Sequence, residues 1–133
     1  MSDKPRPAAV GDAESQPYWD AVRDGRLLVQ RCTNGHHQLY PRPHCIVCRE
    51  PVEWVDASGR AAVYSYTVIH QNFARPWRDL IPYVVALVDL EEGPRLMTNI
   101  IGCEPADVRV GMAVRFRPEP AGDDGAVPVF QPA

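Results

Sequence analysis

The chain has 133 residues, of which 45% are hydrophobic and 23% are charged, a balance that indicates one ordinary globular domain or two small ones. Its 14 prolines exclude a helical bundle, because each proline lacks an N–H donor and clashes with the preceding helical turn. The net charge of −3 disfavours a protein that binds nucleic acids through a basic surface. No apolar run approaches the roughly 18 residues that span a bilayer, and no apolar stretch near the N-terminus resembles a signal peptide. We therefore expect a cytoplasmic protein with reduced cysteines.

The N-terminal part of the chain predicts a tail and a helix. Residues 1–12 are rich in proline and polar side chains, and we expect them to form a flexible tail. Residues 13–25 are expected to form a short amphipathic helix, in which Tyr18 and Trp19 cover a core and Gly25 provides the stop signal.

The C-terminal part predicts strands. Five short segments are rich in β-branched, aromatic or other apolar residues: 60–69, 83–90, 95–101, 113–117 and 127–131. The connections between them leave no room for crossover helices, which favours a small antiparallel barrel. Because the five-stranded OB-fold is the simplest such barrel, we predict a mainly β protein in which residues 57–133 form an OB-fold domain.

Residues 26–56 lie between these two parts and begin with a predicted strand. They contain a dense group of cysteines and histidines: Cys32, His36, His37, His44, Cys45 and Cys48. A structural zinc ion takes four such ligands in a tetrahedron, and the turn from Cys45 to Cys48 has the C-x-x-C spacing that supplies two of them. Cys32 is the third candidate and His36 the fourth, with His37 as its alternate.

Two alternatives to a structural zinc site remain at this point. In the first, the site has been lost, and the cysteines pack as small hydrophobic side chains. In the second, the zinc is catalytic, which is disfavoured because no neighbouring residue resembles an acid or base that would use a zinc-bound water. His44 is a weaker choice for the fourth ligand than either His36 or His37.

A series of short motifs in this chain resembles one known family. The motifs are Tyr18-Trp19, Arg31-Cys32, Gly35-His36, Tyr40-Pro41-Arg42-Pro43, Cys45-x-x-Cys48, Pro82-Tyr83-Val84-Val85 and Val110-Gly111-Met112. Together they are similar to a bacterial and archaeal family in which a rubredoxin-like zinc ribbon is followed by an OB-fold domain. In that family the first knuckle is typically C-x-x-C-G, whereas here the second cysteine is missing and Gly35 follows Asn34. The resemblance therefore implies zinc ligation by Cys32, Cys45 and Cys48 and leaves the fourth ligand open.

The resemblance also implies a function. The family was long described as a domain of unknown function, and its members accompany thiolase-like enzymes of acyl-CoA metabolism. It implies an accessory subunit, without catalytic residues of its own, that binds a thiolase, an aldolase or a hydratase and helps that enzyme to present acyl-CoA. It leaves open a direct contact with acyl-CoA and the formation of a homo-oligomer. A membrane is not an expected partner.

The segment 70–82 joins two predicted strands and is longer than a hairpin requires. It interleaves Phe73 and Trp77 with Arg75 and Arg78. Aromatic side chains pack on an acyl chain or a partner surface, and guanidinium groups fit phosphate oxygens. These four residues are therefore candidates for contact with a partner or with coenzyme A, and the alternative is a surface loop packed on the barrel.

Two other function classes are weighed against the accessory subunit. Zinc ribbons and OB-folds both occur in nucleic-acid-binding modules, and the predicted ribbon is locally basic, but the chain has a single lysine and no dense basic stripe. A stand-alone acyl-CoA enzyme would need an acid–base pair, and none can be assembled from the sequence. Cys103 is interpreted as a structural thiol, because the neighbouring Glu104 would raise its pKa.

Overall fold

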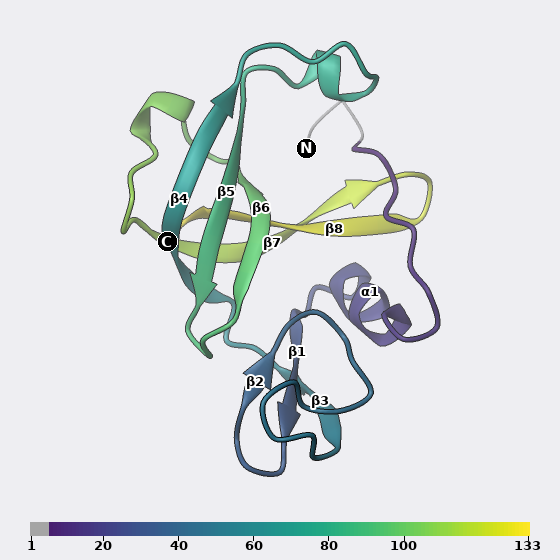
Figure 1. Cartoon of the computed structure of the whole chain (residues 1–133). Coiled ribbons are helices and arrows are strands. Elements are labelled where there is room, and N and C mark those ends of the chain that lie inside the picture. Colours follow the sequence, from purple (N-terminus) through teal and green to yellow (C-terminus); the bar gives the residue numbers. More distant parts are fainter. Residues whose placement is uncertain (1–5) are drawn as a thin grey trace.

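The computed structural model describes residues 6–133, in which an α-helix and a three-stranded sheet precede a five-stranded barrel (Figure 1). The helix is α1 (Gln16–Arg23), and the small sheet, called the ribbon sheet below, consists of β1 (Leu28–Cys32), β2 (His37–Gln38) and β3 (Val52–Asp56). The barrel consists of β4 (Arg60–Ile69), β5 (Tyr83–Leu90), β6 (Arg95–Ile100), β7 (Ala113–Ala121) and β8 (Gly125–Pro132). Two 3-10 turns, η1 (Trp77–Asp79) and η2 (Pro105–Asp107), lie in the connections.

The barrel closes in the strand order β4-β5-β6-β8-β7. Neighbouring strands are antiparallel except β6 and β8, which run parallel and meet at Ile100 and Phe130. Along β5 every second side chain is buried, from Val84 to Leu90, because successive side chains of a strand point to opposite faces. The predicted mainly β fold with a five-stranded OB-fold barrel is confirmed.

The helix is shorter than the segment 13–25 that the sequence predicts for it. Proline lies in its first turn, where the missing N–H donor removes no helical hydrogen bond. Gly25 follows its C-terminus with a φ of 85°, and the N–H of Arg26 donates to the carbonyl of Ala21 at 2.8 Å. Gly25 thus ends the helix and allows the chain to turn into β1.

The ribbon sheet has the strand order β2-β1-β3, and two of its strands are absent from the sequence prediction. β2 has only two residues, which is too short to show any periodicity. β3 ends at Asp56, and after three residues the chain enters the barrel at Arg60. The ribbon is therefore joined to the barrel by a very short connection.

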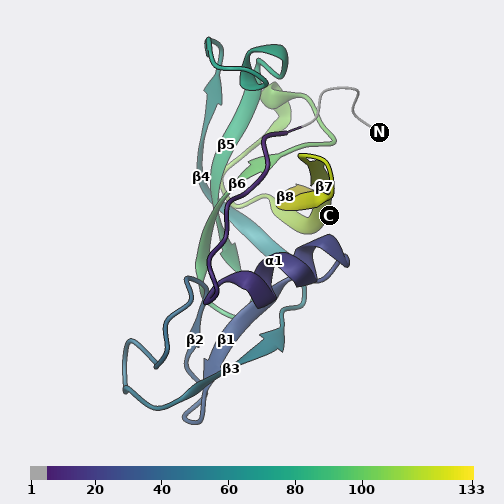
Figure 2. The same cartoon turned by 90° about the vertical axis from the view of Figure 1, so that its right-hand side faces the viewer.

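The helix, the ribbon and the barrel share one apolar core. Figure 2 shows α1 lying between the ribbon sheet and the β7–β8 side of the barrel. Tyr18 and Val22 of the helix and Val29 of β1 belong to the same buried cluster as Val88 and Phe130 of the barrel. The three parts are thus packed together by apolar contacts as well as linked by the chain.

The segment expected to be a flexible tail is only partly within the described residues, since residues 1–5 lie outside them. From Arg6 onward the chain contacts the barrel: Arg6 forms a β-bridge with Ala121, and the N–H of Gly122 donates to its carbonyl at 3.0 Å. The β7–β8 hairpin thus anchors the start of the described chain.

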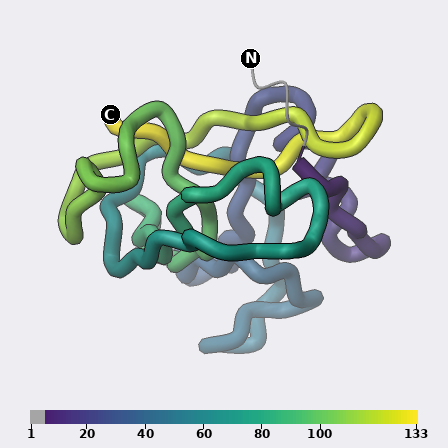
Figure 3. Tube along the Cα trace, turned by 90° about the horizontal axis from the view of Figure 1, so that it is seen from above, coloured from purple at the N-terminus to yellow at the C-terminus, as the bar shows by residue number. Residues whose placement is uncertain are grey.

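The connection between β4 and β5 lies at the end of the molecule remote from the ribbon, as Figures 1 and 3 show. It carries the residues 70–82 that the sequence singled out. Within residues 6–133, the structure contains no helix that is long and apolar enough to cross a membrane.

Candidate metal centre

The first half of the candidate site is a tight turn at the end of β1. The N–H of Gly35 donates to the carbonyl of Cys32, and the N–H of Cys32 donates to the carbonyl of His36, each at 3.0 Å. Gly35 has a φ of 85°, a conformation that glycine adopts without strain. The turn returns the chain on itself, so His36 stands beside Cys32 and its N–H points at the Cys32 sulfur at 3.3 Å.

The second half is the turn that contains Cys45 and Cys48. The N–H of Val47 points at the sulfur of Cys45 at 3.4 Å, and the N–H of Arg49 donates to the Cys45 carbonyl at 2.9 Å. The N–H of Cys45 in turn donates to the carbonyl of Glu50 at 2.8 Å. These bonds form a knuckle in which two sulfur atoms face the first turn.

The two turns bring Cys32, His36, Cys45 and Cys48 together, with one ligand atom of each within 4.8 Å of all the others. The His36 Nδ1 lies 3.4 Å from the Cys32 sulfur and 3.7 Å from the Cys45 sulfur, and the Cys32 and Cys48 sulfurs are 3.6 Å apart. With Zn–S bonds of about 2.3 Å and Zn–N bonds of about 2.0 Å, the edges of a tetrahedral site measure roughly 3.5–3.8 Å. The donor atoms therefore fit a zinc ion, and the predicted zinc cofactor is confirmed at the level of a four-residue site.

The other two histidines lie in different places. His37 is the first residue of β2 and pairs with Arg31 of β1, and His44 forms an isolated β-bridge with Pro51. Among the described residues neither belongs to the cluster. The structure thus brings the favoured candidate His36 into the cluster and leaves out its alternate His37.

Backbone N–H groups also act on the thiols. The pKa of Cys45 is lowered chiefly by the backbone N–H of Cys48, and the pKa of Cys48 is lowered chiefly by the backbone N–H of Glu50. Burial raises the pKa of Cys32. Because the thiolate is the form that binds a metal ion, two of the three cysteines are in surroundings that favour ligation.

Two buried glutamines connect the knuckle to the ribbon sheet. The Gln38 amide donates to the Gln30 Oε1 at 2.7 Å and to the carbonyl of His44 at 3.3 Å, and its Oε1 accepts the N–H of Ile46 at 3.0 Å. The Gln30 Oε1 also accepts the N–H of Arg42 at 3.0 Å. These bonds hold the residues on both sides of Cys45. The sequence carries one signal of the glutamines, because alternation along β1 places Gln30 on the same face as Cys32.

The four candidate contact residues of segment 70–82 do not form one cluster. Phe73 is 79% exposed, and Arg75 and Arg78 are exposed as well. Trp77 is half-buried, and its ring centroid lies 5.1 Å from that of Tyr83. Trp77 thus packs on the barrel, whereas the other three side chains face outward.

Cys103 is distant in the sequence from the metal centre, and its surroundings oppose a thiolate. Burial raises its pKa, and the carboxylates of Asp107 and Glu104 add to the effect. The predicted direction of the pKa shift is confirmed. A thiol held in its neutral form is a poor nucleophile.

Two family models match adjacent parts of the chain. One is described as "ChsH2, rubredoxin-like zinc ribbon domain" and matches residues 19–53. The other is described as "ChsH2, C-terminal OB-fold domain" and matches residues 54–118. Their common border falls within β3, and together they cover the second half of the helix, the metal centre and most of the barrel.

Similar curated proteins carry two kinds of name. A "Probable enoyl-CoA hydratase alpha subunit" of Thermomonospora curvata is 38% identical over 133 residues, which represent 98% of this chain and 40% of that protein. The chain thus spans less than half the length of this relative. A "DUF35 domain-containing scaffold protein" of Methanocaldococcus jannaschii is 35% identical over 116 residues, which represent 82% of each protein.

A solved structure named "Ltp2-ChsH2(DUF35) aldolase" contains a chain with the same architecture. It superposes with a TM-score of 0.84 at 34% sequence identity, and the match covers 93% of this chain and 98% of that one. The likeness extends over the ribbon and the barrel together.

Proposed function

The chain belongs to the DUF35 family of zinc-ribbon and OB-fold proteins, and on this premise we propose that it is a non-catalytic accessory subunit that binds a thiolase-like enzyme and helps it to present acyl-CoA. The proposal rests mainly on the match to 98% of a chain in the structure named "Ltp2-ChsH2(DUF35) aldolase". The hydratase-subunit name of the Thermomonospora curvata relative supports the same class of role.

The metal centre supports a structural role for zinc within this subunit. A structural zinc site has four protein ligands, whereas a catalytic site keeps one position open for water or substrate. Three cysteines and His36 supply a complete set of four. When bound, the ion would fix the two turns of the ribbon to each other, and Cys32, Cys45, Cys48 and His36 would hold it.

The β4–β5 connection is the proposed contact surface for the partner enzyme. Phe73 presents an almost fully exposed aromatic ring, and Arg75 and Arg78 are exposed beside it. Aromatic residues, including phenylalanine, and arginines are enriched at protein interfaces relative to the rest of the surface. The segment lies at the end of the barrel remote from the ribbon, so the metal centre is free of this contact (Figure 1).

Co-expression with a thiolase-like protein encoded nearby tests the proposal. We expect the two proteins to co-purify as a stable complex with about one zinc ion per accessory chain. Phe73→Asp is expected to weaken the complex at least about tenfold, because it places a charge in the apolar centre of the interface. Val110→Asp is the matched control, since Val110 is 68% exposed on the β6–β7 connection.

Two results would contradict the proposal in different ways. If the wild-type proteins neither co-purify nor change each other's solubility or activity, the accessory role is wrong. If they co-purify and Phe73→Asp behaves as Val110→Asp does, the role stands and the contact surface lies elsewhere.

A further inference from the structure

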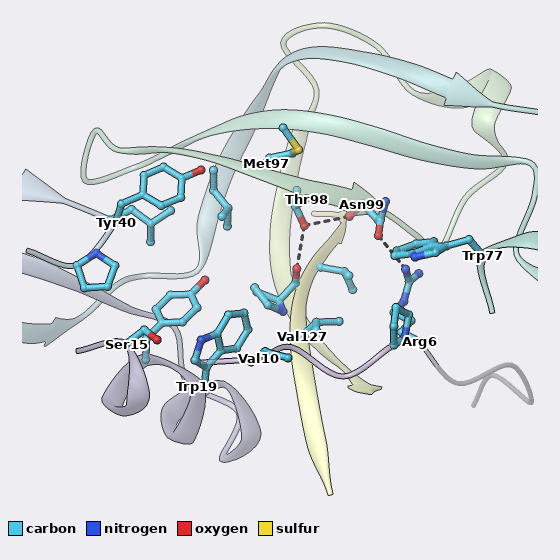
Figure 4. A pocket seen from close by; sticks show the side chains of 17 residues that line it. Arg6, Val10, Ser15, Trp19, Tyr40, Trp77, Met97, Thr98, Asn99 and Val127 are labelled. Carbon is cyan, nitrogen blue, oxygen red and sulfur yellow. Dashed lines mark hydrogen bonds between the residues drawn. The ribbon is translucent and has the colours of Figure 1, made fainter. Parts of the chain in front are cut away.

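A cavity of about 470 Å³ lies where α1, the first described residues and the ribbon meet strands β6 and β8 (Figure 4). Its volume falls within the range of roughly 300–1,000 Å³ that is usual for pockets that bind small molecules. It is separate from the metal centre, since none of the four clustered residues lines it. The accessory function proposed above assigns no role to this cavity.

Most of the cavity wall is apolar. Trp19 comes from the helix, Tyr40 from the ribbon, Trp77 from the β4–β5 connection, and Leu96 and Val129 from the barrel. Figure 4 shows Tyr40 at one end of the cavity, Trp77 at the other, and Trp19 between them. Side chains of four separate parts of the chain thus surround an elongated apolar space, which suits an extended apolar ligand.

The positively charged guanidinium of Arg6 lies at one end of the cavity. The guanidinium of Arg6 donates to the Asn99 Oδ1 at 2.8 Å and lies 5.9 Å from the centre of the Trp77 ring (Figure 4). Asn99 is itself held by the bond from its Nδ2 to the carbonyl of Val84 at 2.9 Å, so its oxygen faces Arg6. The β-bridge between Arg6 and Ala121 holds the main chain of Arg6 in place.

Among the described residues the guanidinium of Arg6 forms no ion pair, and the charge of Glu119 acts on it from a longer distance. The ion pairs within residues 6–133 join other side chains, and the bond to Asn99 uses one of the five N–H donors of the guanidinium. Burial lowers the pKa of Arg6, and the negative charge of Glu119 opposes this shift. A partly buried cation without an ion pair is unfavourable, and an anion at this end of the cavity would reduce the penalty.

We propose that this cavity binds an amphipathic carboxylate, with the carboxylate paired to the guanidinium of Arg6 and the apolar body between Trp19 and the barrel strands. The charge of Arg6 specifies the anionic group, and the elongated apolar wall specifies a hydrocarbon chain or ring system. The site is formed by this chain alone, so the inference goes beyond the partner enzyme and does not depend on it.

Calorimetric titration of the zinc-loaded chain with dodecanoate tests the inference. We expect saturable binding at one site, together with a change in tryptophan fluorescence, because two of the three tryptophans line the cavity. Dodecanol has the same chain without the charge and is expected to bind at least about tenfold more weakly, because its hydroxyl cannot form an ion pair with the guanidinium.

Two pairs of variants locate the site. Arg6→Gln is expected to weaken dodecanoate binding about tenfold or more, whereas Arg109→Gln, which removes the same charge from an exposed position, leaves it unchanged. Met97→Trp fills the rim of the cavity and is expected to abolish binding, and Val110→Trp is its control. Met97 is 61% exposed, so the larger ring does not disturb the core.

The inference is overturned if dodecanoate does not bind saturably, if dodecanol binds equally well, or if either variant behaves as its control does. Dodecanoyl-CoA separates a free acid from a thioester. If the thioester binds and the free acid does not, the cavity serves the acyl-CoA of the proposed function, and the proposal of a carboxylate site is wrong.

Discussion

The ribbon and the barrel are built from the same kind of short strands, but different interactions hold them together. The barrel closes on itself and fills its interior with apolar side chains such as Val63, Val88 and Phe130. In the ribbon sheet and its turns, Val29 and Leu39 belong to the apolar core, whereas the other buried side chains include two cysteines and two glutamines. In the ribbon, sulfur and amide groups thus occupy positions that apolar side chains fill in the barrel.

The difference shows that the size of a folded unit determines which interactions stabilise it. A segment of about 30 residues buries too little apolar surface to offset the entropy lost on folding, so small units of this kind rely on metals, disulfides or neighbouring domains. The ribbon uses a metal centre, a polar network and its packing on the helix and barrel. Substitutions in the ribbon and in the barrel should therefore have different consequences.

Replacing Cys48 with serine is expected to release the metal and to unfold the ribbon while the barrel stays folded. Structural zinc contributes on the order of 10 kcal/mol to the folding of small zinc peptides, and the site loses one of its four ligands. Metal analysis together with amide hydrogen exchange is the measurement. We expect rapid exchange in residues 26–56 and protection in β4–β8. Retained zinc with an unchanged exchange pattern would show that packing alone holds the ribbon.

Replacing Phe130 with alanine is expected to destabilise the barrel while the ribbon keeps its zinc ion. Phe130 is fully buried and packs edge-to-face against Phe116, with ring centroids 6.2 Å apart. Truncating a core phenylalanine costs about 3–5 kcal/mol, because apolar contact is lost and a cavity remains. Urea denaturation should show this loss, while zinc content at low temperature stays at the wild-type level. A variant that loses zinc in parallel with stability would argue against independent sources of stability.

Replacing His36 with alanine is expected to lower the zinc affinity by roughly a hundredfold or more, since loss of an outer-shell partner alone costs about 10–100-fold. His37→Ala is the matched control, because His37 lies outside the cluster on β2. Competition with a coloured zinc chelator measures both affinities. Equal affinities in the two variants would mean that neither imidazole completes the site.

Replacing Gln38 with leucine is expected to destabilise the ribbon by about 1–3 kcal/mol, because the carbonyl of His44 and the N–H of Ile46 lose their partners. Zinc release to a chelator should be faster, since these two residues flank Cys45. Gln131→Leu in the barrel is the control, because its partner Arg117 is at the surface side of β7. If zinc is released from the Gln38 variant at the wild-type rate, the hydrogen bonds of the two glutamines serve the packing of the ribbon and not the retention of the metal.

Replacing Arg60 with glutamine is expected to have the smallest effect, and the effect depends on pH. The Arg60 guanidinium, 2.6 Å from a Glu91 carboxylate oxygen, lowers the pKa of Glu91 from its ordinary value of 4.5. The lowered pKa stabilises the folded state at pH values above the pKa of Glu91 in the unfolded chain. This contribution is lost as the pH falls through the lower pKa of Glu91 in the folded protein. The difference in Tm between wild type and variant should be present at pH 7 and vanish in acid. A difference that persists below the folded-state pKa would assign the effect to packing.

The barrel could be predicted from the sequence because apolar and β-branched residues mark each of its strands. The three cysteines could be predicted because their spacing is itself the signal of a zinc ribbon. The choice between His36 and His37 could not be decided from residue types, since neighbouring residues in an extended chain point in opposite directions. Only the turn at Gly35, which directs the His36 N–H to the Cys32 sulfur, decides between them.

The cavity could not be predicted for a different reason. Arg6 lies in a segment whose composition indicates a tail, and its partners Asn99 and Trp77 are far away in the sequence. Contacts over such separations leave no periodic pattern that a single sequence could show. They arise when the barrel closes and the β7–β8 hairpin provides an anchor for the first described residues.

The exposure of His36 has a consequence for the order of events when the metal is exchanged. Its side chain faces solvent, whereas Cys32 and Cys45 are buried and the knuckle sulfurs are held by backbone N–H groups. An incoming chelator would therefore meet the imidazole before it meets the thiolates. With a metal ion bound, His36 would be its most solvent-exposed ligand, and Cys32, Cys45 and Cys48 would hold it from the more buried side. The site is thus open to solvent at one ligand and closed at the sulfur side, so its imidazole edge is where access to a bound ion would be least restricted.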